Sequence, residues 1–548
     1  MGPGPDPMDE IKNQLQKQFA ELKVIEGKID ALGAALAEAV EILKGEIDGA
    51  KYYSAFQALN LSTSDIDAAY ERLQFYATAQ PGTGSKKEMD ELATTIRNTI
   101  PNAFIAIKNN LLGAAASGEN LTSLGTKVAF TASKSIDEYA ETIHLQFMYY
   151  YGLQLKALML IIEAYHYDSN PSVAKQYFNT YVGQMNEEIN IYLKYAPKCK
   201  LQNTLPLDSD VTAIVPKGDK VYVQAGLETE GGKLFTIKTN NVQILNTMPL
   251  PDARITWNML EKDNVAYMVS MSREDSTRWD INKVTLGDAP KLLGHLSYSP
   301  PGQGMMRFGF LTGFDIDGDF LYAMFMAIGQ DGFTIKVIDL KTFTFAEDIN
   351  ITERVQSAGS QRGNGLRAKD GKIYITAWFS NDSFSSVKVI DAKTKAVVQT
   401  LKTEPTSGSA GMSPVTIKGD LLYCATGDSQ LRIINLAKPV LELLSQTYIK
   451  VYIQNIIVDG YLIYFTSFSA SPDSRGNLHL AYFSPKSSFL QKSMTIGNGT
   501  SALSMDSTRL YAGAGGGEKT LYVLGYAHDL TGNIIPVDPS TLGEHLPE

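Results

Sequence analysis

The stretch DGKIYITAWFSNDSFSSVKVIDAKT, residues 370–394, contains the pattern on which the fold depends. An Asp-Gly turn precedes a short strand that includes Tyr374, and a second strand with alternating apolar residues leads into an Asp-Ala-Lys-Thr turn. Alternation with a period of two predicts β-strands, and the Gly, Asp and Asn residues between them predict turns. The stretch therefore predicts strands joined by turns.

Similar stretches follow one another along the last three-fifths of the chain. In each of them a turn with Asp, Gly or Asn comes shortly before a tyrosine, at positions Tyr222, Tyr267, Tyr322, Tyr374, Tyr423, Tyr464 and Tyr511. The intervals between these tyrosines are 45, 55, 52, 49, 41 and 47 residues, and a period of this size is typical of blades or solenoid coils. Seven copies of a four-stranded unit predict a seven-bladed β-propeller. Six or eight blades are the alternative, because the intervals between the second and fourth tyrosines are long.

The first two hundred residues have a different pattern. Apolar residues recur every three or four positions from Ile11 to Ile47, which predicts one long α-helix. Capping patterns at Ser85 and Ser135 predict the beginnings of further helices. We therefore expect a multidomain α + all-β protein, with an α-helical bundle ahead of the propeller. The expected divisions are 1–7 as a tail or expression remnant, 8–197 as the α-helical bundle, 198–209 as a linker and 210–548 as the seven-bladed β-propeller.

One predicted helix, over 135–167, is apolar nearly all round and is expected at the centre of the bundle. Gln154, Lys156 and Glu163 interrupt it, so it does not fit an ordinary transmembrane helix. The alternative is a latent membrane-active segment that an amphipathic coat keeps soluble. The residues that would carry this activity are Leu153, Leu158, Leu160, Ile161 and Ile162.

Composition and charge argue against several functions. The chain has 49 basic and 59 acidic residues and a net charge of -10, with no basic block, so nucleic acid is not an expected partner. Two cysteines cannot form a disulfide scaffold or a cysteine-based metal site. The six histidines form no zinc-binding motif. We therefore predict no catalytic residue, no metal and no cofactor.

Polar, glycine-rich loops precede several of the predicted inner strands of the propeller. Such loops converge on the central channel, and glycine lets a backbone approach a ligand closely. The glycines could equally serve only the turns. The residues that we predict to bind a ligand there are Arg307, Gln361, Arg362, Asn364, Arg367, Ser409 and Asn498.

The repeated unit resembles those of seven-bladed propellers related to the YVTN and quinoprotein-like families, and the match is best over residues 370–394. The resemblance implies the propeller architecture and no activity. Tryptophans at 257, 279 and 378 do not recur once per blade, as the tryptophan-docking pattern of quinoproteins would require. The helical part is only loosely similar to the bundles of α-helical pore-forming and insecticidal toxins, through one apolar helix wrapped by amphipathic ones.

The favoured hypothesis is a non-enzymatic, toxin-like or defence binding protein. The propeller would recognise a glycan or protein on a cell surface. The helical bundle would act as an assembly domain, or as an effector that reaches a target membrane after a conformational change. One alternative is a non-toxic protein-interaction scaffold, a homo-oligomer that dimerises through the long helix as a coiled coil. A second alternative is a propeller hydrolase with a metal in its channel. A soluble protein is expected, and secretion without a visible signal peptide stays open.

Overall fold

The structure, a computed structural model, divides into two compact units. The first comprises residues 1–197 with 527–548, and the second comprises residues 198–526. The residues that the structure describes are 23, 26–27, 29–34, 47–78, 86–112, 120–168, 170–226, 231–250, 253–272, 274–275, 277–300, 309–327, 332–353, 355–357, 365–379, 385–402, 414–426, 430–449, 451–468, 477–484, 487–496, 500–514 and 518–528.

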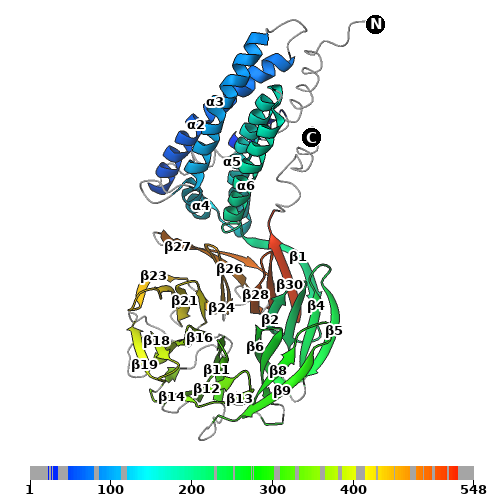
Figure 1. Ribbon diagram of the computed structural model, residues 1–548. Coiled ribbons are helices and arrows are strands. Elements are labelled where there is room, and N and C mark those ends of the chain that lie inside the picture. Colours follow the sequence, from blue (N-terminus) through cyan, green and yellow to red (C-terminus); the bar gives the residue numbers. More distant parts are fainter. Residues whose placement is uncertain are drawn as a thin grey trace. The chain divides into compact units, whose positions relative to one another are not determined.

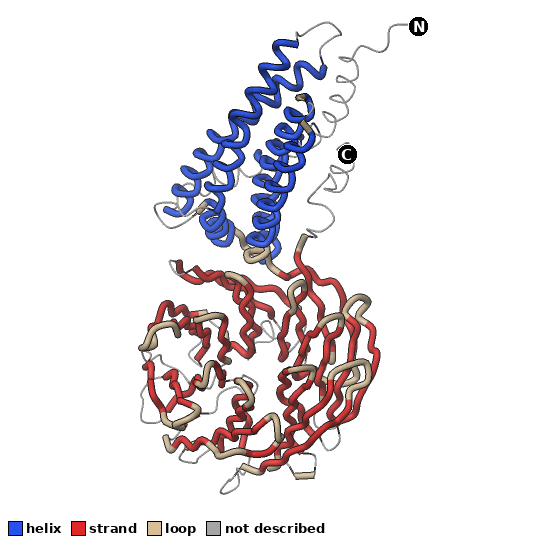
Figure 2. The backbone as a smooth tube through the Cα atoms, in the orientation of Figure 1, coloured by secondary structure: helices blue, strands red, loops and turns tan. Residues whose placement is uncertain are grey.

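The first unit is a bundle of α-helices (Figure 1, Figure 2). Its helices are α2 (Ile47–Thr78), α3 (Lys86–Leu112), α4 (Leu121–Ala132), α5 (Ile136–Tyr167) and α6 (Pro171–Tyr192). α5 packs against each of the other four. The five apolar side chains of α5 that we considered for membrane activity are at most 6% exposed. α5 is therefore the core helix of the bundle, as its all-round apolar sequence predicts.

Glycines set how closely the beginning of the chain approaches α5. Residues 29–34 are helical, and the remainder of the predicted long helix before α2 lies mostly outside the described residues. A Cβ atom on Gly152 would lie 2.8 Å from Cγ1 of Ile29, and one on Gly33 would lie 3.0 Å from Cε2 of Tyr149. A larger residue at either position would therefore push this segment away from α5.

The second unit contains seven antiparallel sheets, which form the blades of a β-propeller (Figure 1). This confirms the number of blades that the repeat predicts. Blade 1 is β2 (Val211–Lys217), β3 (Lys220–Ala225), β4 (Gly232–Lys238) and β5 (Gln243–Leu250). Blade 2 is β6 (Ala253–Lys262), β7 (Val265–Ser272), β8 (Trp279–Thr285) and β9 (Lys291–Tyr298). Blade 3 is β10 (Gly309–Asp317), β11 (Phe320–Ala327), β12 (Phe333–Asp339), β13 (Thr344–Phe345) and β14 (Ile349–Ile351).

The remaining blades follow in chain order. Blade 4 is β15 (Val355–Ser357), β16 (Leu366–Lys369), β17 (Lys372–Phe379), β18 (Ser385–Asp391) and β19 (Val397–Lys402). Blade 5 is β20 (Val415–Lys418), β21 (Leu421–Thr426), β22 (Gln430–Asn435) and β23 (Glu442–Tyr448). Blade 6 is β24 (Tyr452–Asp459), β25 (Leu462–Phe468), β26 (Asn477–Ser484) and β27 (Ser487–Thr495). Blade 7 is β28 (Thr500–Met505), β29 (Arg509–Ala514), β30 (Thr520–Tyr526) and β1 (Lys198–Pro206).

The seven repeat tyrosines occupy the same place in every blade. Each is the third residue of the strand that pairs with the inner strand, and each is at most 6% exposed. Tyr322 of blade 3 shares an apolar cluster with Ile373 of blade 4. Tyr511 of blade 7 shares one with Val221 of blade 1. The tyrosines recur because they help to fill the cores between adjacent blades.

The ring is closed by a strand from the other end of the unit. Residues 198–209 are expected as a linker, but Lys198–Pro206 forms β1, which pairs antiparallel with β30 from Lys198 opposite Tyr526 to Pro206 opposite Thr520. β30 would otherwise leave a free edge of backbone hydrogen-bonding groups. The propeller unit therefore begins at Lys198 and ends at Tyr526, whereas the expected boundaries are 210 and 548.

Candidate functional site

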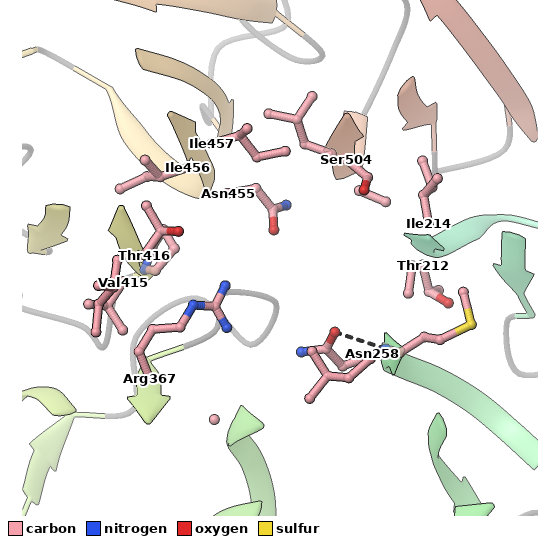
Figure 3. Close-up of a pocket in the computed structure, with 18 of the residues that line it drawn as sticks. Thr212, Ile214, Asn258, Arg367, Val415, Thr416, Asn455, Ile456, Ile457 and Ser504 are labelled. Carbon is pink, nitrogen blue, oxygen red and sulfur yellow. Dashed lines mark hydrogen bonds between the residues drawn. The ribbon is translucent and has the colours of Figure 1, made fainter. Parts of the chain in front are cut away.

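The candidate site is the central channel of the propeller. A cavity of about 290 Å³ there is lined by the inner strands of all seven blades: β2, β6, β10, β16, β20, β24 and β28 (Figure 3). Its lining combines aliphatic side chains with polar ones, which are Thr212, Asn258, Thr312, Arg367, Thr416, Lys418, Asn455 and Ser504. Each of these strands belongs to a different packed sheet. The wall of the channel is therefore rigid and is formed by seven segments of the chain.

Strand register gives the seven inner strands an equivalent position. One residue of each inner strand pairs with the repeat tyrosine of its blade, and it always lies seven positions before that tyrosine in the sequence. We call these seven half-buried residues the channel ring, although Val215 and Asp315 do not line the cavity. Its members, from blade 1 to blade 7, are Val215, Leu260, Asp315, Arg367, Thr416, Ile457 and Ser504.

Five of the inner strands contain a β-bulge at an equivalent place, ten positions before the repeat tyrosine. The extra residues are Thr212, Trp257, Thr312, Gln454 and Ser501. A bulge bends a strand and changes the direction of its side chains. The hydroxyl groups of Thr212 and Thr312 donate hydrogen bonds to the carbonyl oxygens of Gln224 (3.1 Å) and Met324 (3.3 Å). These two hydroxyls thus bond to the neighbouring strand of their own blade.

The channel ring contains two charged residues, and they lie in adjacent blades. A guanidinium nitrogen of Arg367 lies 3.9 Å from a carboxylate oxygen of Asp315, and the other carboxylate oxygen accepts a hydrogen bond from the backbone N–H of Ala368 at 2.8 Å. Burial raises the pKa of Asp315, and the charge of Arg367 and the backbone N–H groups oppose this shift. Figure 3 shows the guanidinium of Arg367 and the side-chain amides of Asn258 and Asn455 directed toward the middle of the cavity.

Of the residues predicted to bind a ligand, Arg367 lies in the channel. The other six, Arg307, Gln361, Arg362, Asn364, Ser409 and Asn498, lie outside the described residues. The prediction missed Asn258, Thr416 and Ser504. A signal for two of them was present in the sequence, because Thr416 and Ser504 stand seven positions before a repeat tyrosine.

Two negative findings apply to the described part of the chain. Within it, no three residues among His, Cys, Asp and Glu form a group that could hold a metal ion. None of its helices is long and apolar enough to cross a membrane.

No family model matches this chain, and no curated protein matches it in sequence. Among solved structures, the chain is similar to the crystal structure of BamB from Moraxella catarrhalis, with 12% sequence identity and a TM-score of 0.37. That match covers 60% of this chain and 99% of the BamB chain. The fold and the channel together define a seven-bladed β-propeller with a polar channel, in a chain that also contains a helical bundle.

Proposed function

We propose that this chain is a non-enzymatic binding protein whose propeller recognises a glycan or protein on a cell surface. The observation that supports this is the channel, where side chains from seven blades surround one cavity of about 290 Å³. Loops and strand ends on a rigid scaffold are the usual place for recognition. Arg367 contributes a charged donor inside the cavity. The predicted residues Arg307, Gln361, Arg362, Asn364, Ser409 and Asn498 precede inner strands in the sequence, and we propose that they extend the same site.

A glycan-array and cell-binding screen of the full chain tests this function. We expect selective binding to a limited set of glycans or to a surface protein, and weaker binding after Arg367→Gln. A matched control is Lys220→Gln, because Lys220 lies outside the cavity lining and pairs with the exposed carboxylates of Asp219 in blade 1 and Asp288 in blade 2. No binding to any glycan or cell surface would contradict the proposal.

For the helical unit we propose a role as a membrane-active effector or an assembly domain. Its core helix α5 buries Leu153, Leu158, Leu160, Ile161 and Ile162, so a membrane would meet these side chains only after the bundle opens. Dye leakage from liposomes, measured with the full chain at several pH values, tests the effector role. Stable dimers without leakage would favour the scaffold alternative instead.

A further inference from the structure

We propose that the propeller channel binds the carboxylate of an acidic sugar and that the guanidinium of Arg367 holds it. The inference rests on the proposed binding function and narrows its ligand. It follows from the hydrogen-bond donors around the cavity, from the position of the one nearby carboxylate and from the size of the space.

Arg367 has unused hydrogen-bonding capacity. Within the described residues its guanidinium forms no hydrogen bond, and its ionic contact there is with Asp315 at 3.9 Å, which is too long for a hydrogen bond. A guanidinium has five N–H donors in a planar fork that matches the two oxygens of a carboxylate. The side chain lines the cavity and is 24% exposed. A ligand carboxylate could therefore be held by two parallel hydrogen bonds.

Neutral donors from three other blades face the same space. The side-chain oxygen of Asn258 accepts a hydrogen bond from the backbone N–H of Met259 at 2.9 Å, which leaves its amide N–H groups for a ligand. The hydroxyl groups of Thr416 and Ser504 line the cavity and form no hydrogen bond with another described residue. Among the described lining residues there is no carboxylate. The donors outnumber the side-chain acceptors, so the cavity suits a ligand rich in acceptors and negatively charged.

Asp315 leaves the cavity side of Arg367 open. It lies outside the cavity lining, and one of its oxygens is occupied by the backbone N–H of Ala368. Its negative charge attracts the guanidinium from one side without forming a hydrogen bond to it. A ligand in the channel would approach Arg367 from the other side, where Figure 3 shows the guanidinium directed into the cavity.

The size of the cavity and its lining favour a sugar ring over an extended chain. Its volume of about 290 Å³ is at the small end of ligand sites, which commonly span about 300–1,000 Å³. A pyranose ring carries oxygen atoms on every side, so it can accept from donors that come from several blades. Leu260 and Ile457 also line the cavity and would contact the C–H groups of the ring. An acidic peptide side chain would present one carboxylate on an apolar stem and would leave most of these donors unpaired.

Ligand-observed NMR titration of the full chain tests the inference with three probes: glucuronate, the methyl ester of glucuronic acid, and glucose. We expect glucuronate to bind at least about tenfold more tightly than the other two, because charge-assisted hydrogen bonds are the stronger kind. Arg367→Gln should weaken glucuronate binding by about tenfold or more. Arg367→Lys should bind glucuronate more tightly than Arg367→Gln but less tightly than the wild type, because lysine lacks the planar fork.

Two further variants separate binding from folding and from general attraction. Arg367→Gln combined with Asp315→Asn removes both charges of the pair, so it should fold even where the single variant leaves Asp315 unpaired, and it should still lose glucuronate binding. Lys220→Gln is the matched control, because Lys220 is a cation of the propeller that lies outside the cavity lining and pairs with exposed carboxylates. It should change the affinity by less than about twofold, in line with the weak effect of exposed charges.

Each of the other outcomes would contradict one part of the proposal. Equal loss in the Lys220 variant would show general charge attraction and overturn the role of Arg367. Binding of a glutamate-rich peptide without binding of glucuronate would contradict the proposal that the ligand is a sugar. If glucose bound as tightly as glucuronate, the proposed recognition of a carboxylate would be wrong. The proposed binding function would still stand. Absence of binding to every glycan and cell surface in the screen would overturn both.

Discussion

At the scale of single residues, two positions of the repeat have different roles. The tyrosine is the same in all seven blades, because at each place it fills part of the core between blades. The residue seven positions earlier varies through Val, Leu, Asp, Arg, Thr, Ile and Ser, although every one occupies the same place in its strand. Five of these residues line the cavity, although Val215 and Leu260 also pack against the apolar clusters between blades. The polar cavity residues at this position, Arg367, Thr416 and Ser504, are therefore available to a ligand.

The first residue prediction concerns Lys198, the first residue of β1. Its side chain is 1% exposed and forms an ion pair with Asp459 of blade 6. It also lies over the ring of Tyr526, 5.0 Å from the ring centre. Lys198→Met should lower the free energy of unfolding of the propeller by about 2–3 kcal/mol, somewhat less than for a fully buried pair, because Asp459 is 28% exposed.

Urea unfolding followed by tryptophan fluorescence measures this effect in the full chain, because all three tryptophans, at 257, 279 and 378, belong to the propeller unit. Lys220→Met is the control. Lys220 pairs with Asp219 and Asp288, which are 60% and 81% exposed, so its removal should leave the midpoint unchanged. An equally small effect at Lys198 would contradict the prediction.

Glu188 of α6 gives a prediction about pH. Burial raises its pKa to about 7, although its hydrogen bond from Gln154 (2.8 Å) and the charge of Lys108 oppose the shift. The unfolded chain has the ordinary value near 4.5, so the folded state holds the proton more tightly. The contribution of Glu188 is therefore complete below pH 4.5 and is lost as the pH rises through 7. From pH 5 to pH 8 the helical unit should lose about 2–3 kcal/mol of stability through this group.

Circular dichroism at 222 nm during urea unfolding follows the helical unit at each pH. Glu188→Gln should abolish this part of the pH dependence, because glutamine keeps the acceptor for Gln154 and does not ionise. Glu187→Gln is the control, since the side chain of Glu187 is 70% exposed. If the unfolding free energy changed with pH equally in the wild type and in Glu188→Gln, Glu188 would not be the source of this pH dependence.

At the scale of elements, the sequence predicts what depends on local pattern. The seven blades follow from turn residues and strand alternation around each tyrosine, and α5 follows from its all-round apolar surface. Local pattern does not predict the strand β1, because Lys198–Pro206 contains no repeat tyrosine and pairs with a strand more than three hundred residues away. The channel residues depend on register. Arg367 was predicted from a loop composition, whereas Thr416 and Ser504 require counting back from the tyrosines, which periodicity alone does not suggest.

The burial of α5 yields a prediction for this element. Leu158 is 0% exposed, and Leu158→Ala should destabilise the helical unit by about 2–5 kcal/mol through lost apolar burial and the cavity that remains. Leu61→Ala in α2 is the matched control, because Leu61 is 77% exposed and should change stability by less than about 0.5 kcal/mol. Urea unfolding followed at 222 nm measures both. Similar effects at the two positions would show that α5 is not the core of the bundle.

At the scale of the whole molecule, the propeller depends on a strand contributed from the start of its unit. β1 completes blade 7, and the backbone N–H of Lys198 donates a hydrogen bond to the hydroxyl of Tyr464 in blade 6 at 2.8 Å. This strand therefore joins the last blade to the blade before it. Because Lys198 pairs with Tyr526, the chain also enters and leaves the propeller unit at the same end of one strand pair. Residues outside 198–526 can thus form a separate unit without interrupting the ring.

This closure predicts that a fragment of residues 198–526 folds and unfolds cooperatively, whereas a fragment of residues 207–526 is several kcal/mol less stable or aggregates through the open edge of β30. Tryptophan fluorescence during urea unfolding and light scattering would measure the difference. The peptide KCKLQNTLP, residues 198–206, added to the shorter fragment should restore stability in proportion to its concentration, because it binds only the folded ring. A scrambled peptide should have no effect, and the Lys198→Met peptide should bind more weakly because it lacks the pair with Asp459. Equal stability of the two fragments without peptide would show that blades 1–7 close without β1.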